Sequence, residues 1–508
     1  MTRPRLAAAL ATTLAVAGLT VPGALTSAQA STPPKGPTVR HGCVASVPEP
    51  GTQVRTDICF TLFKPAGASR TRKVPMVLHS HGWGGSRTKD PAAFARWLDA
   101  GFGVLSFDQR GFGESGGQAH IMNPAYEGRD VKRLVRLVSR LRWVQRDGRG
   151  DPRLGAIGGS YGGGYQFAGA FRFLMDRGEP VFDALAPEIT WWDLKESLAP
   201  QEVVRAAWAL LLSAAGQEAL PTDIKAALAQ GLATGMWPDG SVPGTPDLDA
   251  FFERNGPRWH VQQGRRLDIP VLFRQGATDS LFPLEQGLTN FRKALTPRAR
   301  RHSIFVGYNG GHVLPAVFPP AVGVAGDPCS AKLGSRDFAD LAVRFMKEKL
   351  KGRDAGVRGF NRYHLGTADG AGCVTVRSVA PNTSVTLDSP LATPEAGGPP
   401  VAVQVAEGPI RVAGTPSMTG TMYAAGVNNR AFYALAVGSS PSTPGSCRTT
   451  CCRSTSSRRS PARSDGSRSR RWRCGCPRAR TCTSWRRPPA TRSSAWAAAR
   501  RARSCSRT

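Results

Sequence analysis

The sequence predicts an α/β fold, with a mostly parallel sheet covered by helices on both faces, followed by an all-β domain. Short apolar runs that suit buried strands alternate with helix-like stretches from about residue 54 to residue 350, and this alternation is typical of parallel sheets. A glycine-rich G-x-S-x-G turn centred on Ser160 joins one such strand to one such helix. From about Phe360 onward the apolar runs are short and lie between Gly, Pro, Ser and Asn, as in β-sandwiches.

The strands and helices of the first region follow one another in a regular order. Strands are expected at 39–43, 54–63, 74–79, 103–107, 153–157, 183–189, 269–275 and 302–306. Helices are expected at 91–100, 131–141, 161–175 and 335–350. We interpret the basic side chains on the second helix as a solvated face. Because sites in parallel sheets form at the carboxyl ends of the strands, we expect the functional residues in the loops after these strands.

A stretch without strand-like runs interrupts the alternation from Trp191 to about Asp268. Leu- and Ala-rich segments at 203–215 and 224–232 predict helices there, and we expect a helical cap that shapes a pocket and excludes water. Burial in the core of the cap is the better explanation for any single tryptophan of this stretch. The tryptophans that are nevertheless candidates to line the pocket are Trp191, Trp192, Trp208, Trp237 and Trp259.

The residues around Ser160 have the pattern that a nucleophilic serine needs. A tight turn between strand and helix lifts the Oγ atom above the sheet, and the small residues Gly158 and Gly162 let neighbouring backbone pass close by. A glycine-rich turn that contains a serine by chance is the alternative. The strand before it, the helix after it and the partners described next favour the nucleophile.

A serine hydroxyl needs a base to take its proton, and the base needs an acid to hold its tautomer. His312 follows two glycines after the last predicted strand, which suits a loop that reaches the serine. Asp279 follows the strand that begins at Ile269, with Asp268 and Glu285 as nearby competitors for the acid. The chain order Ser, Asp, His is the order found in one large class of serine hydrolases.

Two backbone N–H groups are expected to form an oxyanion hole. One belongs to Tyr161, directly after the serine, and the other to Trp83 in the loop that follows the strand ending at His79. His79 and His81 are spaced as metal ligands can be, but no third ligand is apparent in the sequence. We therefore expect neither a metal nor a cofactor.

Five motifs together resemble those of the α/β-hydrolases: H-G-W-G-G at 81–85, D-Q-R-G-F-G-E-S at 108–115, G-G-S-Y-G-G at 158–163, the loop of Asp279, and G-G-H at 310–312. With a cap and a C-terminal β-domain, residues 40 to 440 resemble the X-prolyl dipeptidyl-peptidase and cocaine-esterase family of serine hydrolases. The resemblance implies an α/β-hydrolase fold with an inserted helical cap and a jelly-roll-like β-sandwich. Where some members of that family place a tyrosine hydroxyl in the oxyanion hole, this chain has Trp83 and offers only a backbone N–H.

The resemblance implies a secreted serine hydrolase that works through an acyl-enzyme. Its substrate would be a peptide with proline second from the N-terminus or, alternatively, a small ester or other amide, with no nucleic-acid or membrane partner. A dipeptidyl-peptidase must hold the free ammonium group of its substrate. The carboxylates available for this in and near the cap are Glu188, Asp193, Glu196 and Glu202.

The N-terminal sequence has the features of a secretory signal peptide at 1–30, with a basic start, an apolar run and an A-x-A site that ends at Ala30. Beyond it we expect a catalytic domain at 31–355 with its cap at 191–268, an incomplete β-sandwich at 356–446, and a tail at 447–508. Export permits disulfides, and the four cysteines before the tail allow three pairings. Proximity in the sequence favours Cys43 with Cys59 and Cys329 with Cys373.

The tail accounts for much of the formal charge of +31. From Cys447 to Thr508 it holds eighteen Arg, no Lys and one acid, which leaves +14 on the other 446 residues, an ordinary value for a basic secreted enzyme. A polyanion-binding protein that acts through this tail is the non-enzyme alternative. The tail has no Leu, Ile, Val, Met, Phe or Tyr, so it cannot bury a core and we expect it to be disordered.

The composition of the tail also predicts a shift of reading frame near 438–447. Arg, Ala, Pro, Gly, Ser, Cys and Trp are what G/C-rich DNA encodes out of frame, and the expected strand at 431–437 has no evident partner after it. We expect that translation of the coding DNA in another frame past codon 438 gives strand-like sequence that completes the sandwich. Absence of such sequence in both other frames would establish the tail as a genuine basic extension.

Overall fold

The computed structural model describes residues 36–312, 327–368 and 370–387, together with short stretches between 401 and 501. The expected signal peptide at 1–30 lies outside the described residues, as do 313–326. Among the helices that the structure describes, none combines the length and the apolar character needed to cross a membrane.

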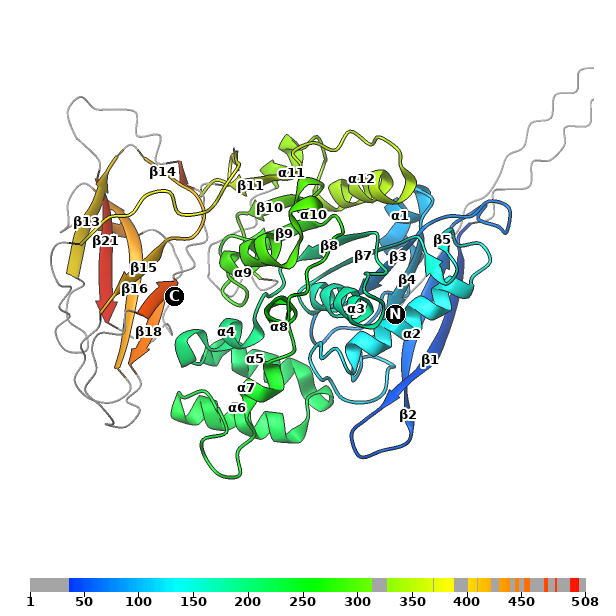
Figure 1. The fold of residues 1–508 in the computed structure, drawn as a ribbon, viewed down its shortest axis with the longest axis horizontal. Helices are drawn as coiled ribbons and strands as arrows, with labels where there is room; N and C mark the ends of the chain where they lie inside the picture. Colours follow the sequence, from blue (N-terminus) through cyan, green and yellow to red (C-terminus); the bar gives the residue numbers. More distant parts are fainter. Residues whose placement is uncertain are drawn as a thin grey trace, which may run out of the picture. The chain divides into compact units, whose positions relative to one another are not determined.

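A ten-stranded sheet forms the centre of the fold (Figure 1). Its strands are β1 Thr38–Pro48, β2 Arg55–Lys64, β3 Met76–Ser80, β4 Gly103–Phe107, β7 Leu154–Gly159, β8 Ala184–Glu188, β9 Leu272–Gly276, β10 Ile304–Tyr308, β11 Arg362–Gly366 and β12 Cys373–Val376. They are arranged in the order β1-β2-β4-β3-β7-β8-β9-β10-β11-β12. The strands from β4 to β11 in this order run parallel, and β1, β2 and β12 pair antiparallel at the edges. The predicted parallel α/β sheet is therefore confirmed.

Helices cover both faces of the sheet because successive strand side chains point to opposite sides. Leu78 of β3 and Leu105 of β4 pack in one buried cluster with α2 Glu127–Arg140 and α3 Tyr161–Arg177. Their neighbours Val77 and Val104 pack in a second cluster with α1 Ala95–Asp99 and α12 Phe338–Lys351. The remaining elements of this region are η1 Pro91–Phe94, the short hairpin strands β5 Arg146–Gly148 and β6 Asp151–Pro152, and α9 Leu284–Thr289, η4 Asn290–Ala294, α10 Pro297–Arg301 and α11 Pro328–Lys332.

The segment between β8 and β9 is helical, as the sequence predicts for a cap. Its elements are α4 Leu194–Leu198, η2 Pro200–Glu202, α5 Ala206–Gly216, η3 Gln217–Ala219, α6 Thr222–Thr234, α7 Leu248–Phe252 and α8 Pro257–Gln262. Local chemistry sets several of the helix ends. Asp193 caps α4 by accepting a hydrogen bond from the Glu196 N–H, and Asp247 caps α7 in the same way through the Ala250 N–H. Gly235 ends α6 in the left-handed conformation.

Both disulfides join the cysteines that proximity in the sequence favours. Cys43 and Cys59 are opposite each other in the β1–β2 ladder, and Cys329 of α11 is bonded to Cys373 of β12. The central sheet does not end at the predicted domain boundary of 355, because β11 pairs with β10 and β12 pairs with β11 beyond it. A short apolar strand between glycines looks the same whether it belongs to a sandwich or to the edge of a larger sheet, and only pairing distinguishes the two.

The C-terminal strands form a five-stranded sheet and two strand pairs. The sheet contains β13 Val401–Glu407, β16 Asn429–Gly438, β17 Pro444–Ser446, β18 Cys452–Ser456 and β21 Ser494–Arg501. The pairs are β14 Arg411–Val412 with β20 Arg480–Thr481, and β15 Ser417–Gly420 with β19 Arg470–Arg473. The expectation of a wholly disordered tail is not met at β18–β21, nor is that of a strand at 431–437 without a partner, since β16 pairs with both β18 and β21. Strand pairing uses backbone groups, which an Arg-rich segment also has; the sandwich packing and the reading frame stay predictions.

A buried histidine makes the stability of this fold sensitive to acid. His260 of α8 is 2% exposed, stacks on Phe171 of α3 with ring centroids 4.2 Å apart, and its Nδ1 atom has no hydrogen-bond partner among the described residues. Burial lowers the pKa of His260 to about 3. In the unfolded chain His260 takes up a proton as the pH falls through about 6.5, whereas in the folded chain it stays neutral until a much lower pH. The free energy of unfolding therefore decreases as the pH drops below about 6.5.

We expect the substitution His260→Phe, which keeps the ring stack, to remove this acid sensitivity. Between pH 7 and pH 4 the free energy of unfolding of the wild type should lose on the order of 3 kcal/mol more than that of the variant. Urea unfolding at both pH values measures the difference. Equal losses in the two proteins would show that His260 is protonated in the folded state.

Candidate active site

Ser160 lies in the turn between β7 and α3 with a backbone φ of 56° and ψ of −121°. Positive φ is uncommon for a residue with a side chain, so the surrounding structure must hold this conformation. The Ser160 N–H donates to the Glu188 carbonyl of β8 (2.9 Å), and the Ser160 carbonyl accepts hydrogen bonds from the Gly163 and Gly164 N–H groups. The turn is thereby tied to the neighbouring strand on one side and to the first turn of α3 on the other.

The two glycines of the G-x-S-x-G pattern are required by close backbone contacts. A Cβ atom at Gly162 would collide with the Ser80 carbonyl oxygen at the end of β3. A Cβ atom at Gly158, which has a φ of 142°, would lie 2.6 Å from the Gly162 carbonyl oxygen. The helix can therefore approach β3 and β7 closely enough to present the serine at the carboxyl edge of the sheet.

Ser160, His312 and Asp279 come together in one hydrogen-bonded chain. The His312 Nε2 atom is 2.9 Å from the Ser160 Oγ atom, and its Nδ1 atom is 2.8 Å from Asp279 Oδ2. All three residues are buried. Two aromatic rings, Trp208 at 5.6 Å and Phe282 at 5.2 Å between centroids, pack nearly perpendicular to the imidazole.

Asp279 is held in place by its own loop. Its Oδ1 atom accepts hydrogen bonds from the Leu281 N–H (2.9 Å) and the Phe282 N–H (2.8 Å), which leaves Oδ2 for His312. The two carboxylates that compete with Asp279 for the role of the acid have arginine partners instead. Asp268 pairs with Arg298, and Glu285 with Arg292.

The two expected oxyanion donors come from the first residue of α3 and from the loop after β3. Tyr161 opens α3, where the first N–H groups have no partner within the helix. The loop of Trp83 approaches from the end of β3, and a Cβ atom on the adjacent Gly82 would lie 3.8 Å from that of Ser160. No acceptor for the Trp83 N–H is present among the described residues.

Both ring nitrogens of His81 have hydrogen-bond partners in the loops after β3 and β4. Its Nε2 atom accepts a hydrogen bond from the Gln109 N–H (3.1 Å), so its Nδ1 atom carries the proton donated to the Gly82 carbonyl (2.7 Å). Burial lowers the pKa of His81, which favours this neutral form. His79 contacts the Ser106 hydroxyl instead, and the described residues contain no group of three side chains that could hold a metal.

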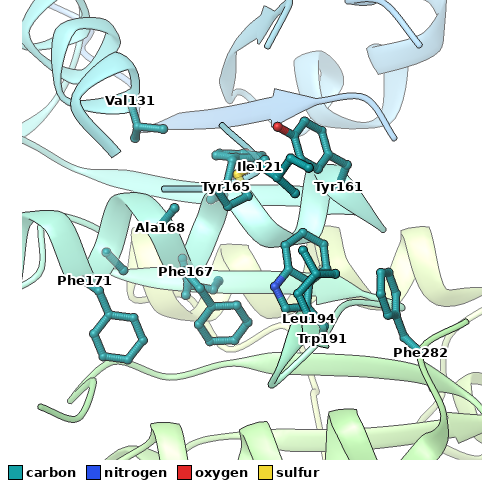
Figure 2. Packing of buried hydrophobic residues seen from close by; sticks show 14 of the residues in the cluster. Ile121, Val131, Tyr161, Tyr165, Phe167, Ala168, Phe171, Trp191, Leu194 and Phe282 are labelled. Carbon is teal, nitrogen blue, oxygen red and sulfur yellow. The ribbon is translucent and has the colours of Figure 1, made fainter. Parts of the chain in front are cut away.

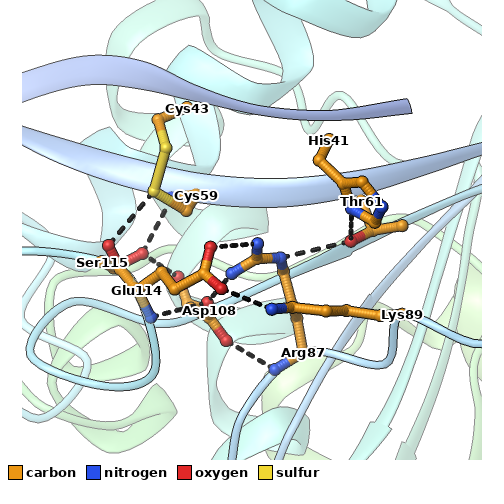
Figure 3. The surroundings of a disulfide bond; sticks show 9 residues. All are labelled: His41, Cys43, Cys59, Thr61, Arg87, Lys89, Asp108, Glu114 and Ser115. Carbon is orange, nitrogen blue, oxygen red and sulfur yellow. Dashed lines mark hydrogen bonds and ion pairs between the residues drawn. A yellow bond between two sulfur atoms is a disulfide. The ribbon is translucent and has the colours of Figure 1, made fainter.

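A buried charge network that the sequence analysis missed fixes the loops after β3 and β4 (Figure 3). Arg87 forms an ion pair with Asp108, and its other guanidinium nitrogen is 2.6 Å from Glu114. Asp108 also accepts from the Glu114 N–H (2.9 Å), and Ser115 links its carbonyl to the Cys59 N–H beside the first disulfide. The sequence contains a signal for this role, because the D-Q-R-G-F-G-E-S motif lies directly after a buried strand. That motif was interpreted only as support for the family resemblance.

Arg110, the arginine of that motif, is fully buried. Its guanidinium lies 2.7 Å from Asp130 of α2 and 2.6 Å from Glu49, and it also donates to the Val47 carbonyl (2.9 Å). These partners raise the pKa of Arg110 despite its burial. The loop after β4 is therefore anchored to α2 and to the segment that follows β1.

An apolar pocket with about 550 Å³ of empty space, some of it open to solvent, reaches Ser160. Its walls include residues of the oxyanion loop, the serine turn and the cap helices: Trp83, Tyr161, Leu194, Leu212, Leu228 and Phe252. Figure 2 shows part of this wall, where Trp191 lies between Tyr161 and Phe282 with ring centroids 6.4 Å and 5.1 Å away.

Two of the five candidate tryptophans reach the site. Trp191 lines the pocket, and Trp208 covers His312. Trp237 packs on Phe252 and donates to Asp249, and Trp192 and Trp259 contact cationic side chains instead. Burial in the core of the cap is therefore found for Trp237, whereas Trp192 and Trp259 are only partly buried.

The cap helix α5 contacts two loops at the site: the loop of Asp279, called the acid loop, and the loop of Trp83, called the oxyanion loop. Near its start, the Trp208 indole donates to the hydroxyl of Ser280, next to Asp279 (3.1 Å). Near its end, the Leu212 carbonyl accepts a hydrogen bond from the Trp83 indole of the oxyanion loop (2.8 Å). One helix of the cap thus connects the acid loop with the oxyanion loop.

Comparison with known proteins agrees with this architecture. A family described as X-Pro dipeptidyl-peptidase (S15 family) matches residues 51–313, just over half of the chain. An uncharacterized 31.7 kDa protein in the traX-finO intergenic region of Escherichia coli is 35% identical over 100 residues, which are 19% of this chain and 33% of the relative. The chain thus spans about a third of the length of the curated relatives that it matches.

Two solved structures share the fold over most of their length. A CocE/NonD family hydrolase from Staphylococcus aureus is 11% identical with a TM-score of 0.53, and the match covers 91% of this chain and 88% of that one. An α-amino acid ester hydrolase is 13% identical with a TM-score of 0.55, and the match covers 91% and 89%. At these identities the likeness is one of fold alone.

The contact between α3 and β3 generates a prediction about stability. The substitution Gly162→Ala should lower the free energy of unfolding by about 2–3 kcal/mol or more, because the new methyl group meets backbone that cannot move aside. The control is Gly116→Ala, whose Cβ atom would have its closest contact at 3.6 Å and should change stability by less than about 1 kcal/mol. Urea or thermal unfolding of both variants measures this, and equal stability would show that the turn can relax.

Proposed function

The chain belongs to the X-Pro dipeptidyl-peptidase (S15) family, and we propose that it is a serine hydrolase that cleaves an amide or ester bond through an acyl-enzyme. The observation that carries this proposal is the hydrogen-bonded chain from Ser160 through His312 to Asp279 at the carboxyl edge of the sheet. Nucleophile, base and acid stand in the order in which such a mechanism uses them.

In the first half of the reaction, Ser160 Oγ attacks the carbonyl carbon of the substrate while His312 Nε2 takes the hydroxyl proton. The carbonyl oxygen gains negative charge, which the Tyr161 and Trp83 N–H groups stabilise. His312 then donates its proton to the departing amine or alcohol, and the acyl group stays bonded to Ser160. In the second half a water molecule attacks the acyl carbon by the same route, which releases the acid and restores the serine.

Asp279 acts through His312. Its Oδ2 atom accepts the Nδ1–H proton, which keeps Nε2 free to receive the serine proton and stabilises the imidazolium ion. The backbone N–H groups that bind Oδ1 hold the carboxylate against rotation. The rings of Trp208 and Phe282 keep water from this pair, which strengthens its electrostatic interaction.

The S15 membership and the serine chemistry leave two substrate classes, X-prolyl peptides and small esters. Both pass through the same acyl-enzyme and differ in what the pocket must bind beside the scissile bond. The two disulfides support export, since such bonds persist in oxidising compartments. We include secretion in the proposal on that ground, together with the expected signal peptide.

We expect Ser160→Ala to fold normally and to lose activity by about 10⁴- to 10⁶-fold, and His312→Ala to behave nearly the same, because the members of a triad act as a unit. A fluorophosphonate probe should label the wild type and the matched control Ser139→Ala, whose hydroxyl donates to the Arg136 carbonyl on α2, but not Ser160→Ala. Activity of Ser160→Ala above a tenth of the wild-type rate would mean that another residue is the nucleophile.

A further inference from the structure

Resting on the serine hydrolase chemistry proposed above, we infer that the pocket beside Ser160 selects an uncharged, apolar acyl group and rejects an acyl group that carries a free ammonium. The preferred substrate is then an ester or amide of an apolar carboxylic acid, not an N-terminal dipeptide. The inference comes from where the pocket lies, what lines it and how the nearby carboxylates are engaged.

The position of the pocket assigns it to the acyl side of the substrate. A leaving group must lie beside His312 Nε2 to receive its proton, whereas the acyl chain extends from the carbonyl carbon away from the histidine. The described lining extends from Trp83 and Tyr161, which carry the expected oxyanion donors, to Phe282 in the loop after Asp279, and His312 itself is not part of it. The pocket therefore continues from Ser160 and the expected oxyanion donors under the cap, which is where we place the acyl chain.

The described lining of this pocket is aliphatic and aromatic. No charged side chain is part of it, and besides Ser160 and the phenol of Tyr161 its polar side chain is Ser213, whose hydroxyl donates to the Ala209 carbonyl. An ammonium group that entered would lose its hydration without gaining a counter-charge. An alkyl or aryl group would gain free energy from the same burial.

The cap carboxylates that could have held an ammonium point elsewhere. On α4, Leu194 and Leu198 are spaced four residues apart and line the pocket, so Glu196, two residues after the first, falls on a different face. Burial and the nearby Asp193 raise the pKa of Glu196 to about 7. Asp193 itself caps α4 and forms an ion pair with Arg258.

The remaining carboxylates of this region have cations of their own or lie in solvent. Glu188 is 2.8 Å from the guanidinium of Arg274, and Asp249 is 2.6 Å from the amine of Lys195. Glu202 is exposed. A substrate ammonium would have to displace an existing partner to reach any of the paired groups.

A pair of esters that differ by one group tests the inference. One is the p-nitrophenyl ester of phenylalanine, and the other is p-nitrophenyl 2-methyl-3-phenylpropanoate, in which a methyl group replaces the ammonium at nearly the same size. At about pH 6, below the α-amino pKa of ~7.7, the first is a cation. Each kcat/KM is divided by the rate of uncatalysed hydrolysis of the same ester. By this measure p-nitrophenyl 2-methyl-3-phenylpropanoate should be preferred by about 100-fold or more.

A single substitution in the pocket wall tests the cause of that preference. The substitution Ser213→Asp places a carboxylate on the partly exposed wall of α5 and should shift the ratio toward the phenylalanine ester by about tenfold or more. The substitution Ser213→Asn controls for size and should leave the ratio within about threefold of the wild type. Circular dichroism checks that each variant is folded. If Ser213→Asp does not fold, the wild-type ratio of the two corrected kcat/KM values decides the inference by itself.

The outcomes separate this inference from the proposed function. Failure of the fluorophosphonate probe to label Ser160 overturns the serine hydrolase proposal and the inference with it. Labelling combined with a wild-type ratio near one, with a preference for the phenylalanine ester or with no turnover of either ester overturns the inference alone. An unchanged ratio in folded Ser213→Asp shows that this pocket does not hold the acyl group.

Discussion

The close packing of α3 against the ends of β3 and β7 is the constraint on which the site depends. Only glycine at position 162 allows the helix to pass the Ser80 carbonyl, and only with the helix there does Ser160 stand at the edge of the sheet in its strained conformation. The same packing brings the Trp83 loop, which leaves the end of β3, within reach of the serine. The proposed nucleophile and one proposed oxyanion donor, almost eighty residues apart in the chain, thus lie near each other because glycines let the two backbone segments come into contact.

The loops that carry the chemistry are held by charge and by hydrogen bonds from outside the site. Arg87 and Asp108 join the loops after β3 and β4, and Arg110 ties the second of these to α2. Removing one partner from such a buried pair leaves an uncompensated charge, which is strongly destabilising. On the open side, α5 spans the oxyanion loop and the acid loop. The loops around Ser160 are therefore held by the ion pairs of Arg87 and Arg110 and by helix α5 of the cap.

The inference about selectivity rests on the lining of the pocket beside Ser160. Family membership alone is compatible with a substrate that carries an ammonium, because the family takes its description from X-Pro dipeptidyl-peptidases. The described lining of this pocket has no anion to receive one. Of the carboxylates nearby, Asp193 and Glu188 form ion pairs with arginines, and Glu196 is spaced away from the two leucines of α4 that line the pocket. In the proposed function, the sheet therefore positions the hydrogen-bonded Ser160, His312 and Asp279, and the cap supplies much of the pocket that would bind the substrate.

The sequence by itself determined the order of strands and helices, the helical cap, the three residues of the hydrogen-bonded chain and the two disulfides. Each of these depends on local periodicity, on a motif beside a strand end or on short separation along the chain. Only the tertiary structure decided that β11 and β12 belong to the central sheet, that Arg87 and Arg110 anchor the loops, and that Leu194 and Leu198 of α4 line the pocket beside Ser160. Strand pairing, ion pairing and the direction of a side chain into a cavity depend on residues far away in the chain, and a pattern of neighbours along the sequence carries no information about them.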